Sequence, residues 1–185
     1  MSGEAAATEW FEIFDDRGYP CGLVPRHEVH RQGLWHRSAD VWVFGRDGRL
    51  LLQRRAENKD LFSGCWDYSV GEHLRAKESY LAGARRGLRE ELGIFDCELE
   101  IVGGLRRVCT HCPDRRIDDR ELAQSFFVIH DGPVHPDQAE VAEVRWMAPA
   151  AVARWMALEP TAFTPWFRQA AREFEIIPLA EPDLT

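Results

Sequence analysis

The chain has 185 residues and carries 31 acidic against 23 basic side chains, a formal net charge of −8. Its length suits one domain with a sizeable core, and its acidity argues against general binding to nucleic acid or to anionic membranes, which need a basic surface. No apolar run approaches the roughly 18 residues of a membrane span, the first residues lack the pattern of a secretory signal, and the five cysteines lack framework spacing, so we expect reduced thiols and a cytoplasmic location.

The N-terminal half predicts short strands and one short helix. Residues 10–14 alternate apolar and polar, and a turn leads to a returning strand at 19–24, which predicts a hairpin. A proline begins a short helix at 25–30. The remaining elements of this half are strands at 38–44 and 50–54 around a hairpin turn, a loop at 56–65 and a strand at 66–70.

The C-terminal half predicts longer elements. A helix is expected at 79–92, with Leu81, Ala84, Leu88 and Leu92 as its buried stripe. The other predicted elements are strands at 99–108, 122–130 and 141–147, a polar segment at 111–120, and helices at 149–158 and 165–174 that begin with proline. This order predicts a compact α/β unit with a mixed sheet and helices on both sides. The predicted boundaries are a disordered terminus at 1–8, a single domain at 9–178 and a tail at 179–185.

A pair of adjacent acids marks the end of the predicted helix at 79–92. Glu90 and Glu91 follow Arg86 by about one turn, and Glu78 lies in the loop before the helix. Such a pair is often a solvated helix face. When both carboxylates point into one cleft, a divalent cation offsets their repulsion, and hard oxygen ligands favour Mg²⁺ or Mn²⁺, which also bind diphosphate oxygens.

The wider pattern around this pair favours the metal site. Seven residues fit the pattern E-x7-R-x-L-x-E-E-x-G-I, namely Glu78, Arg86, Leu88, Glu90, Glu91, Gly93 and Ile94. The pattern resembles the Nudix box of enzymes that cleave diphosphate linkages. The resemblance implies an α/β/α sandwich with a mixed central sheet, a loop–helix box and an N-terminal hairpin. It also implies metal binding by Glu90, Glu91 and the backbone carbonyl of Gly71, with Arg86 orienting the carboxylates.

Two residues depart from the box. Glu72 stands where the box begins with glycine, although Gly71 precedes it. Gly87 stands where the box has a glutamate that serves many hydrolases as a metal ligand or base. A general base must then come from elsewhere, and Glu78 and Glu121 are the candidates.

Longer runs, among them GRLLLQRRAENKDLFSGCW and TAFTPWF, resemble the isopentenyl-diphosphate isomerase branch of the same superfamily over most of the chain. The resemblance implies that three basic residues bind the diphosphate, Arg26, Arg55 and Lys59. It also puts four residues at or near the metal-binding positions of the isomerase, namely His30, His36, His73 and Glu121.

The chain lacks the residue types that catalyse isomerisation at the corresponding positions. The isomerase uses a cysteine and a glutamate on opposite sides of the double bond, and a tryptophan that stabilises the carbocation. In this chain Gly71 occupies the cysteine position, Ala123 falls near the glutamate and Thr161 replaces the tryptophan. We therefore expect a metal-dependent hydrolase acting on the diphosphate bond of a nucleotide-type or prenyl-type substrate. The alternatives are an isomerase-like enzyme and a non-catalytic ligand-binding module.

Two further groups of residues have a structural interpretation. The run Cys109, His111 and Cys112 could form half of a zinc site, but no second pair lies at matching spacing. Four aromatic residues could line a ligand pocket, although core positions are favoured, Trp35, Trp42, Trp66 and Phe126. Apart from its small-molecule diphosphate substrate the protein is expected to bind neither nucleic acid nor membrane, and to be a monomer or homodimer.

Overall fold

The computed structural model describes residues 9–113 and 117–175. The predictions for residues 1–8, for the tail at 179–185 and for a domain end at 178 lie outside this part of the chain. The strands are β1 (Trp10–Phe14), β2 (Pro20–Pro25), β3 (Trp35–Phe44), β4 (Leu50–Arg55), β5 (Trp66–Asp67), β6 (Val70–His73), β7 (Glu100–Cys112), β8 (Ile117–Ile129) and β9 (Val141–Met147). The helices are α1 (Arg26–Gln32), α2 (Tyr80–Leu92), α3 (Pro149–Leu158) and α4 (Pro165–Glu173), with a short 3₁₀ turn at Pro160–Ala162.

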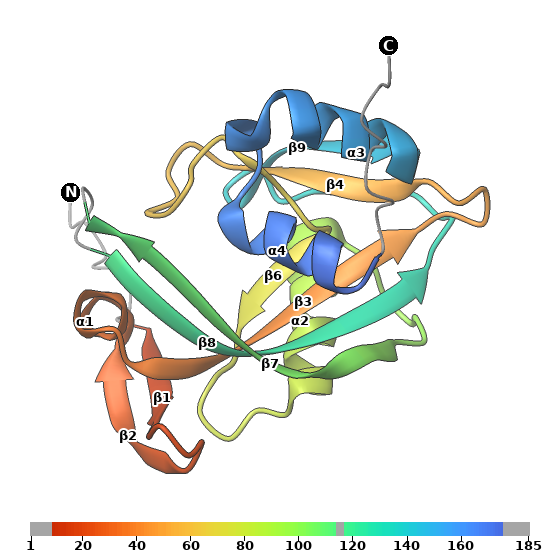
Figure 1. The fold of residues 1–185 in the computed structure, drawn as a ribbon. Coiled ribbons are helices and arrows are strands. Elements are labelled where there is room, and N and C mark those ends of the chain that lie inside the picture. The colour runs from red at the N-terminus through yellow and green to blue at the C-terminus, as the bar shows by residue number, and fades with distance from the viewer. Residues whose placement is uncertain (1–8, 114–116, 176–185) are drawn as a thin grey trace, which may run out of the picture.

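The sheet is mixed, as predicted (Figure 1). Its centre is the parallel pair β3 and β8, which runs from Trp35 opposite Arg120 to Phe44 opposite Ile129. The other pairings are antiparallel: β7 pairs with β8, β6 with β3, and β9 and β5 with β4. The predicted N-terminal hairpin is confirmed as β1 and β2, and it lies with α1 at one end of the long strands.

The second predicted hairpin, β3 and β4, is paired only next to its turn, and beyond it the two strands separate. Between β3 and β4 the one ladder pair is Phe44 with Leu50, after which β3 pairs with β8 and β4 with β9. The predicted strand at 66–70 is therefore divided, with β5 on β4 and β6 on β3. Ser69 fills the opening, because its hydroxyl donates to the Leu51 carbonyl at 2.6 Å and accepts from the Val43 amide at 2.8 Å.

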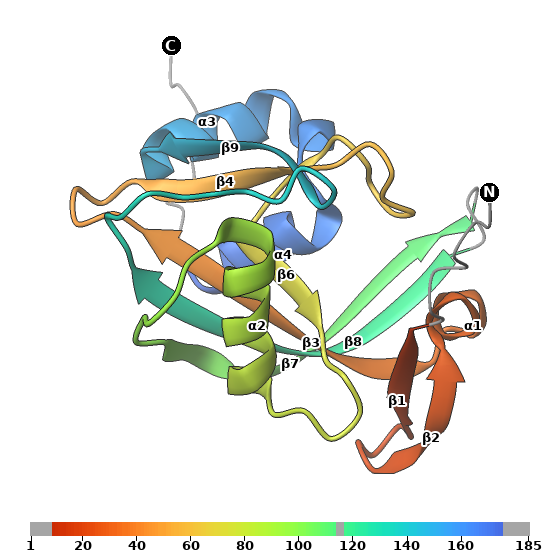
Figure 2. The ribbon, with the colours of Figure 1, turned by 180° about the vertical axis from the view of Figure 1, so that it is seen from behind.

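Two hydrophobic cores cover the two faces of the sheet. On one face α3 and α4 pack on Trp42, Leu50 and Leu52, and on the other α2 packs on Val41 and Leu51. Consecutive residues of β4 thus serve opposite cores, as the two-residue period of a strand requires. Figure 2, seen from behind, shows α2 in front of the sheet with α3 and α4 beyond it.

The ends of α2 follow their sequence signals. The Ser79 hydroxyl caps the helix by accepting from the Ala82 amide at 3.2 Å, and Gly93 ends it in the left-handed conformation. Ala84, Leu88 and Leu92 are buried as predicted, but the prediction for Leu81 is wrong, since this side chain is 37% exposed. None of the helices in the described residues is long and apolar enough to cross a membrane.

The polar segment predicted at 111–120 lies largely within strands. β7 continues to Cys112 and β8 begins at Ile117, so Asp118, Asp119 and Arg120 belong to the ladder. The charges of these three residues hid the alternating pattern of a strand from the sequence analysis. In a strand only every second side chain need face the interior, so charged residues can belong to it. Because Asp119 lies on β8, its side chain reaches the site described next.

Candidate metal and diphosphate site

Three histidines and two carboxylates from four elements meet beside the N-terminal hairpin. His30 comes from α1, His36 from β3 and His73 from the end of β6. The parallel register sets His36 opposite Glu121 on β8, and the strand alternation puts Asp119 on the same face as Glu121. The Nε2 atoms of His30 and His36 lie 3.8 and 3.6 Å from Asp119 Oδ1, and His73 Nε2 lies 3.2 Å from Glu121 Oε1.

The residues of this cluster fit a cation. His30 Nε2, His36 Nε2 and Asp119 Oδ1 are buried without a hydrogen-bond partner among the described residues, and each such atom costs about 1–3 kcal/mol. One divalent ion between them would satisfy all three. His36 Nδ1 lies 3.1 Å from the Leu34 carbonyl; a proton there donates to that oxygen and leaves Nε2 for the metal. Mixed imidazole and carboxylate ligands suit Zn²⁺ or Mn²⁺.

Burial keeps these imidazoles in the neutral, metal-binding form. Desolvation, followed by the nearby imidazoles of His73 and His36, lowers the pKa of His30 to about 3. Desolvation also lowers the pKa of His36, and it lowers that of His73 well below the usual value. In the opposite direction, burial and then the charge of Glu121 raise the pKa of Asp119 well above its usual range. Two carboxylates this close favour a cation between them.

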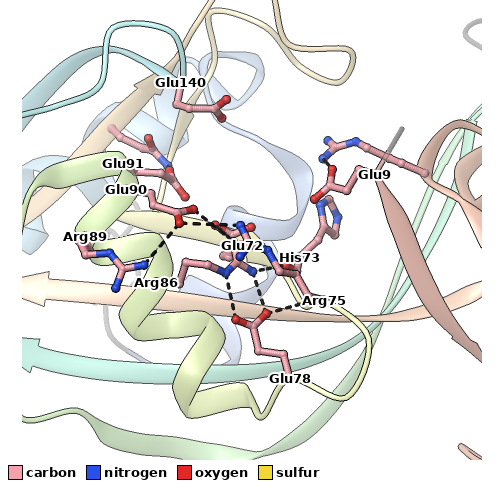
Figure 3. Close-up of polar contacts among 12 residues, drawn as sticks. Glu9, Glu72, His73, Arg75, Glu78, Arg86, Arg89, Glu90, Glu91 and Glu140 are labelled. Atoms are coloured by element: carbon pink, nitrogen blue, oxygen red, sulfur yellow. Dashed lines mark hydrogen bonds and ion pairs between the residues drawn. The ribbon is translucent and has the colours of Figure 1, made fainter. Parts of the chain in front are cut away.

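The Nudix-like box forms a second acidic centre around Arg86 (Figure 3). Its guanidinium binds Glu78 through two hydrogen bonds, Nε to Oε1 at 2.9 Å and Nη2 to Oε2 at 2.8 Å. It also lies 2.9 Å from Glu72 and 3.4 Å from Glu90, and it donates to the His73 carbonyl at 2.9 Å. Arg86 therefore ties α2 to β6 and orients the box carboxylates, as the resemblance implied.

Glu78 is held in place by this network. Besides its paired bonds to Arg86 it accepts from the Arg75 amide at 2.8 Å. The Arg86 hydrogen bonds lower the pKa of Glu78 further below its usual value. A carboxylate with such partners is a poor proton acceptor, so of the two candidate bases Glu121 is the better placed.

Glu91 is the buried member of the box pair. It accepts from the Gln53 amide at 3.0 Å, whereas Glu90 is partly exposed. Burial, followed by the charge of Glu72, raises the pKa of Glu91 to about 8. A buried carboxylate with a raised pKa next to a second carboxylate fits a position that a divalent cation occupies.

The basic residues proposed to bind diphosphate line the same cavity as the box acids. Arg26, Arg55 and Lys59 border it together with Gly71 and the pair Glu90 and Glu91. Arg26 pairs with Glu9 at 3.1 Å, Lys59 forms an ion pair with Glu140, and burial lowers the pKa of Lys59. These cations lie where an anionic ligand bound to the box metal would carry its charge.

Asp67 and Trp166 form a part of the site that the sequence did not predict. The Trp166 indole donates to both Asp67 oxygens, at 3.0 and 2.8 Å, and the Thr164 hydroxyl donates to Asp67 at 3.0 Å. The Arg55 guanidinium lies over the Trp166 ring and 3.5 Å from Asp67. Asp67 thus fixes both the ring and the cation. Its pKa is raised to about 6 by burial.

Near two of the isomerase positions, other residues of this chain lie at the site. Ala123 was placed near the glutamate of the strand, but Glu121 is the residue that faces the cluster. Thr161 was placed at the tryptophan, but Trp166 borders the small pocket that also contains Tyr68, Gly71, His73 and Glu121.

The remaining sequence interpretations have simpler outcomes. The aromatic residues for which a core position was favoured are buried, Trp35, Trp42, Trp66 and Phe126. Cys109 and Cys112 carry free thiols, and the clusters of metal-ligating side chains in the described part of the chain do not include them.

Comparisons with known proteins identify the family of the chain. The model of the NUDIX domain matches residues 34–167. The chain is 41% identical to an isopentenyl-diphosphate Delta-isomerase of Burkholderia multivorans, over 83% of this chain and 84% of the relative. It is 37% identical to a protein of the same name from Nocardia farcinica, over 85% and 90%. An uncharacterised Nudix hydrolase of Pseudomonas aeruginosa is 32% identical, over 78% and 82%.

Solved structures show the same fold at low sequence identity. A Deinococcus radiodurans protein superposes with a TM-score of 0.71 at 18% identity, over 89% of this chain and 98% of the other. A MutT protein of Methanosarcina mazei gives 0.61 at 23% identity, over 76% and 93%. The match to the domain model, together with the box geometry and these similarities, shows that the chain belongs to the Nudix family.

Proposed function

We propose that the protein is a metal-dependent hydrolase that cleaves the diphosphate of a small prenyl-type substrate. The observation that supports the proposal is that metal-ligating, cationic and aromatic side chains lie around one pocket. His73, Asp119 and Glu121 of the buried cluster border one pocket together with the cation Arg55 and the ring of Trp166, and the adjoining cavity contains the box acids. Such a site offers a metal centre, an anion site and a short apolar surface together.

The diphosphate would be bound by Arg26, Arg55 and Lys59. Arginine offers a planar fork and lysine a compact charge, the two means by which proteins bind phosphate oxygens. Lys59 would exchange its partner Glu140 for the ligand, and Asp67 would keep Arg55 in position through the contact at 3.5 Å. In a half-buried cavity each charge-assisted contact contributes about 1.5–3 kcal/mol.

The apolar part of the pocket suits a short hydrocarbon chain. Leu61, Tyr68 and Trp166 form its apolar wall, and all three side chains are buried. The four other aromatic residues considered for base stacking are in the core instead. The curated relatives named for isopentenyl diphosphate support the same substrate class.

Hydrolysis would use water as the nucleophile. A divalent ion at the box carboxylates or the histidine cluster supplies Lewis-acid activation of the phosphate and lowers the pKa of water. Glu121 would accept the proton of the attacking water, with His73 at 3.2 Å holding the carboxylate in place. The bond between the bridging oxygen and the terminal phosphorus breaks, and the products are the prenyl monophosphate and inorganic phosphate.

Isomerisation is the second candidate, and a specific observation favours it. Glu121 and Trp166 border one pocket, so a glutamate and a tryptophan are present there although Ala123 and Thr161 stand at or near the positions of the isomerase residues, and the relative with 41% identity has the isomerase name. One objection remains, because Gly71 has no side chain to exchange a proton on the opposite side of the substrate. Hydrolysis requires no such group. A ligand-binding module without turnover is the third alternative.

A product assay separates these functions. The protein would be incubated with isopentenyl, dimethylallyl and geranyl diphosphates, and with nucleotide sugars as controls, in Mg²⁺ or Mn²⁺. We expect metal-dependent release of phosphate from a prenyl diphosphate, with the monophosphate seen by mass. A product of unchanged mass with a shifted double bond and an intact diphosphate, seen by NMR, would establish isomerisation instead. Binding without any product would establish the module.

A further inference from the structure

The two departures from the Nudix box contact each other. Glu72 on β6 stands where the box has glycine, and Gly87 on α2 stands where it has glutamate. A Cβ atom added at Gly87 would lie 3.1 Å from Glu72 Cβ and 3.5 Å from Glu72 Cγ. It would also lie 2.6 Å from Val70 Cγ1, closer than real Cβ atoms approach. The space next to Gly87 is therefore already filled by the Glu72 stem and Val70.

The Glu72 carboxylate shares its surroundings with the box acids. It lies 2.9 Å from Arg86 Nη1, the same nitrogen that lies 3.4 Å from Glu90. It borders the cavity that contains Glu90, Glu91 and the cation Lys59. Figure 3 shows Glu72 beside Arg86 and Glu90 in the centre of the site. The carboxylate thus reaches the box from the strand instead of from the helix.

We propose that Glu72 is the third carboxylate ligand of the box cation, a role moved from the helix position 87 to the facing strand. The inference rests on the proposed metal-dependent function and names a residue that supplies the acid missing at Gly87. A side chain at position 87 would press against the Glu72 stem at 3.1 Å and overlap Val70 at 2.6 Å, so the glutamate on the strand accompanies a glycine on the helix. Glu90 and Glu91 then retain their usual positions on α2.

A role limited to pairing with Arg86 explains less. Arg86 already has two hydrogen bonds to Glu78, a third to the His73 carbonyl and the contact with Glu90. Its remaining N–H, on Nη1, lies 2.9 Å from Glu72, so one guanidinium faces the three carboxylates of Glu72, Glu78 and Glu90 and cannot balance their charge. A cation among Glu72, Glu90 and Glu91 would offset that excess.

Manganese binding tests the proposal without reference to turnover. The protein would first be loaded with one equivalent of Zn²⁺ to fill the imidazole-rich cluster, which favours this ion. Zn²⁺ gives no signal in electron paramagnetic resonance. Mn²⁺ would then be titrated and the free ion measured by its resonance signal. Glu72→Gln keeps the shape of the side chain and should weaken Mn²⁺ binding at least about tenfold. The matched control Glu140→Gln, which removes a charge from the same cavity, should change it less than about twofold.

A rescue experiment excludes a general loss of charge. Val70→Ala combined with Glu72→Gly removes the atoms that obstruct position 87, and adding Gly87→Glu restores the usual box. The triple variant should bind Mn²⁺ at least about tenfold more tightly than the double variant. Unchanged Mn²⁺ affinity in Glu72→Gln, or equal losses in Glu72→Gln and Glu140→Gln, would overturn the proposal. Weaker Mn²⁺ binding in Glu72→Gln, in a protein that hydrolyses no diphosphate, would support the ligand role and refute the proposed function alone.

Discussion

Replacing Glu91 with glutamine should stabilise the metal-free protein. The pKa of this carboxyl is raised to about 8 in the folded state, from 4.5. Between these values the folded protein keeps a proton that the unfolded chain has lost, so the free energy of unfolding falls as the pH rises. At about 1.4 kcal/mol per pKa unit the penalty has an upper bound of about 3 kcal/mol at pH 7, and it is below about 1 kcal/mol at pH 5. Glutamine removes the ionisation and retains the partner Gln53.

The assay is urea unfolding in EDTA at both pH values, followed by circular dichroism. We expect Glu91→Gln to raise the free energy of unfolding by about 1–3 kcal/mol at pH 7 and by much less at pH 5. In saturating Mn²⁺ the order should reverse, because only the wild-type protein gains the full stabilisation from the bound ion. Metal-dependent turnover should be lost. Glu90→Gln is the matched control, and since its side chain is 44% exposed its effect in EDTA should stay within about 0.5 kcal/mol.

Two results would refute this reasoning. A loss of stability in EDTA at pH 7 would show that the Glu91 charge is compensated without metal. An equal gain at pH 5 and pH 7 would show that the effect does not come from ionisation.

Three further predictions concern the phosphate contacts and the two glycines. Arg55→Ala and Lys59→Ala should each lower kcat/KM about ten- to a hundred-fold with unchanged circular dichroism; full activity in both would show a merely solvated cluster. Gly71→Cys should add isomerase activity, detected as a rearranged product by NMR, if the missing acid is the one obstacle. Gly87→Glu alone should destabilise the fold by about 1–3 kcal/mol in thermal unfolding because of Val70, whose Cγ1 would be 2.6 Å from the new Cβ; an unchanged melting temperature would contradict the close packing.

The sequence predicted those parts of the fold that depend on local signals. The helix at Pro149–Leu158 begins at a proline and matches its predicted bounds, and Ser79 and Gly93 delimit α2 as capping residues do. The contact between Arg86 and Glu90 also followed from spacing, because residues three or four apart share one face of a helix. These features need no knowledge of distant partners.

The parts that were missed depend on pairing between distant segments. Asp119 fell in the polar segment predicted at 111–120, since only the register of β8 against β3 reveals which residues of β8 face the cluster. Trp166 was missed because residue counting across loops does not follow their path in space. The relation of Glu72 to Gly87 required a contact between a strand and a helix, and neither residue's own sequence neighbourhood contains it.

Ser69 has a mechanical consequence for the whole molecule. It lies where the sheet divides into two branches: β3, β6 and β8 contain His36, His73, Asp119 and Glu121 of the cluster, whereas β4 and β5 contain Arg55 and Asp67. Its hydroxyl joins the branches through the Val43 amide and the Leu51 carbonyl. Ser69 thus helps to set the distance between the metal ligands and the phosphate-binding cations, although it contacts neither group. A change at Ser69 would alter how well one ligand can bind both groups at once.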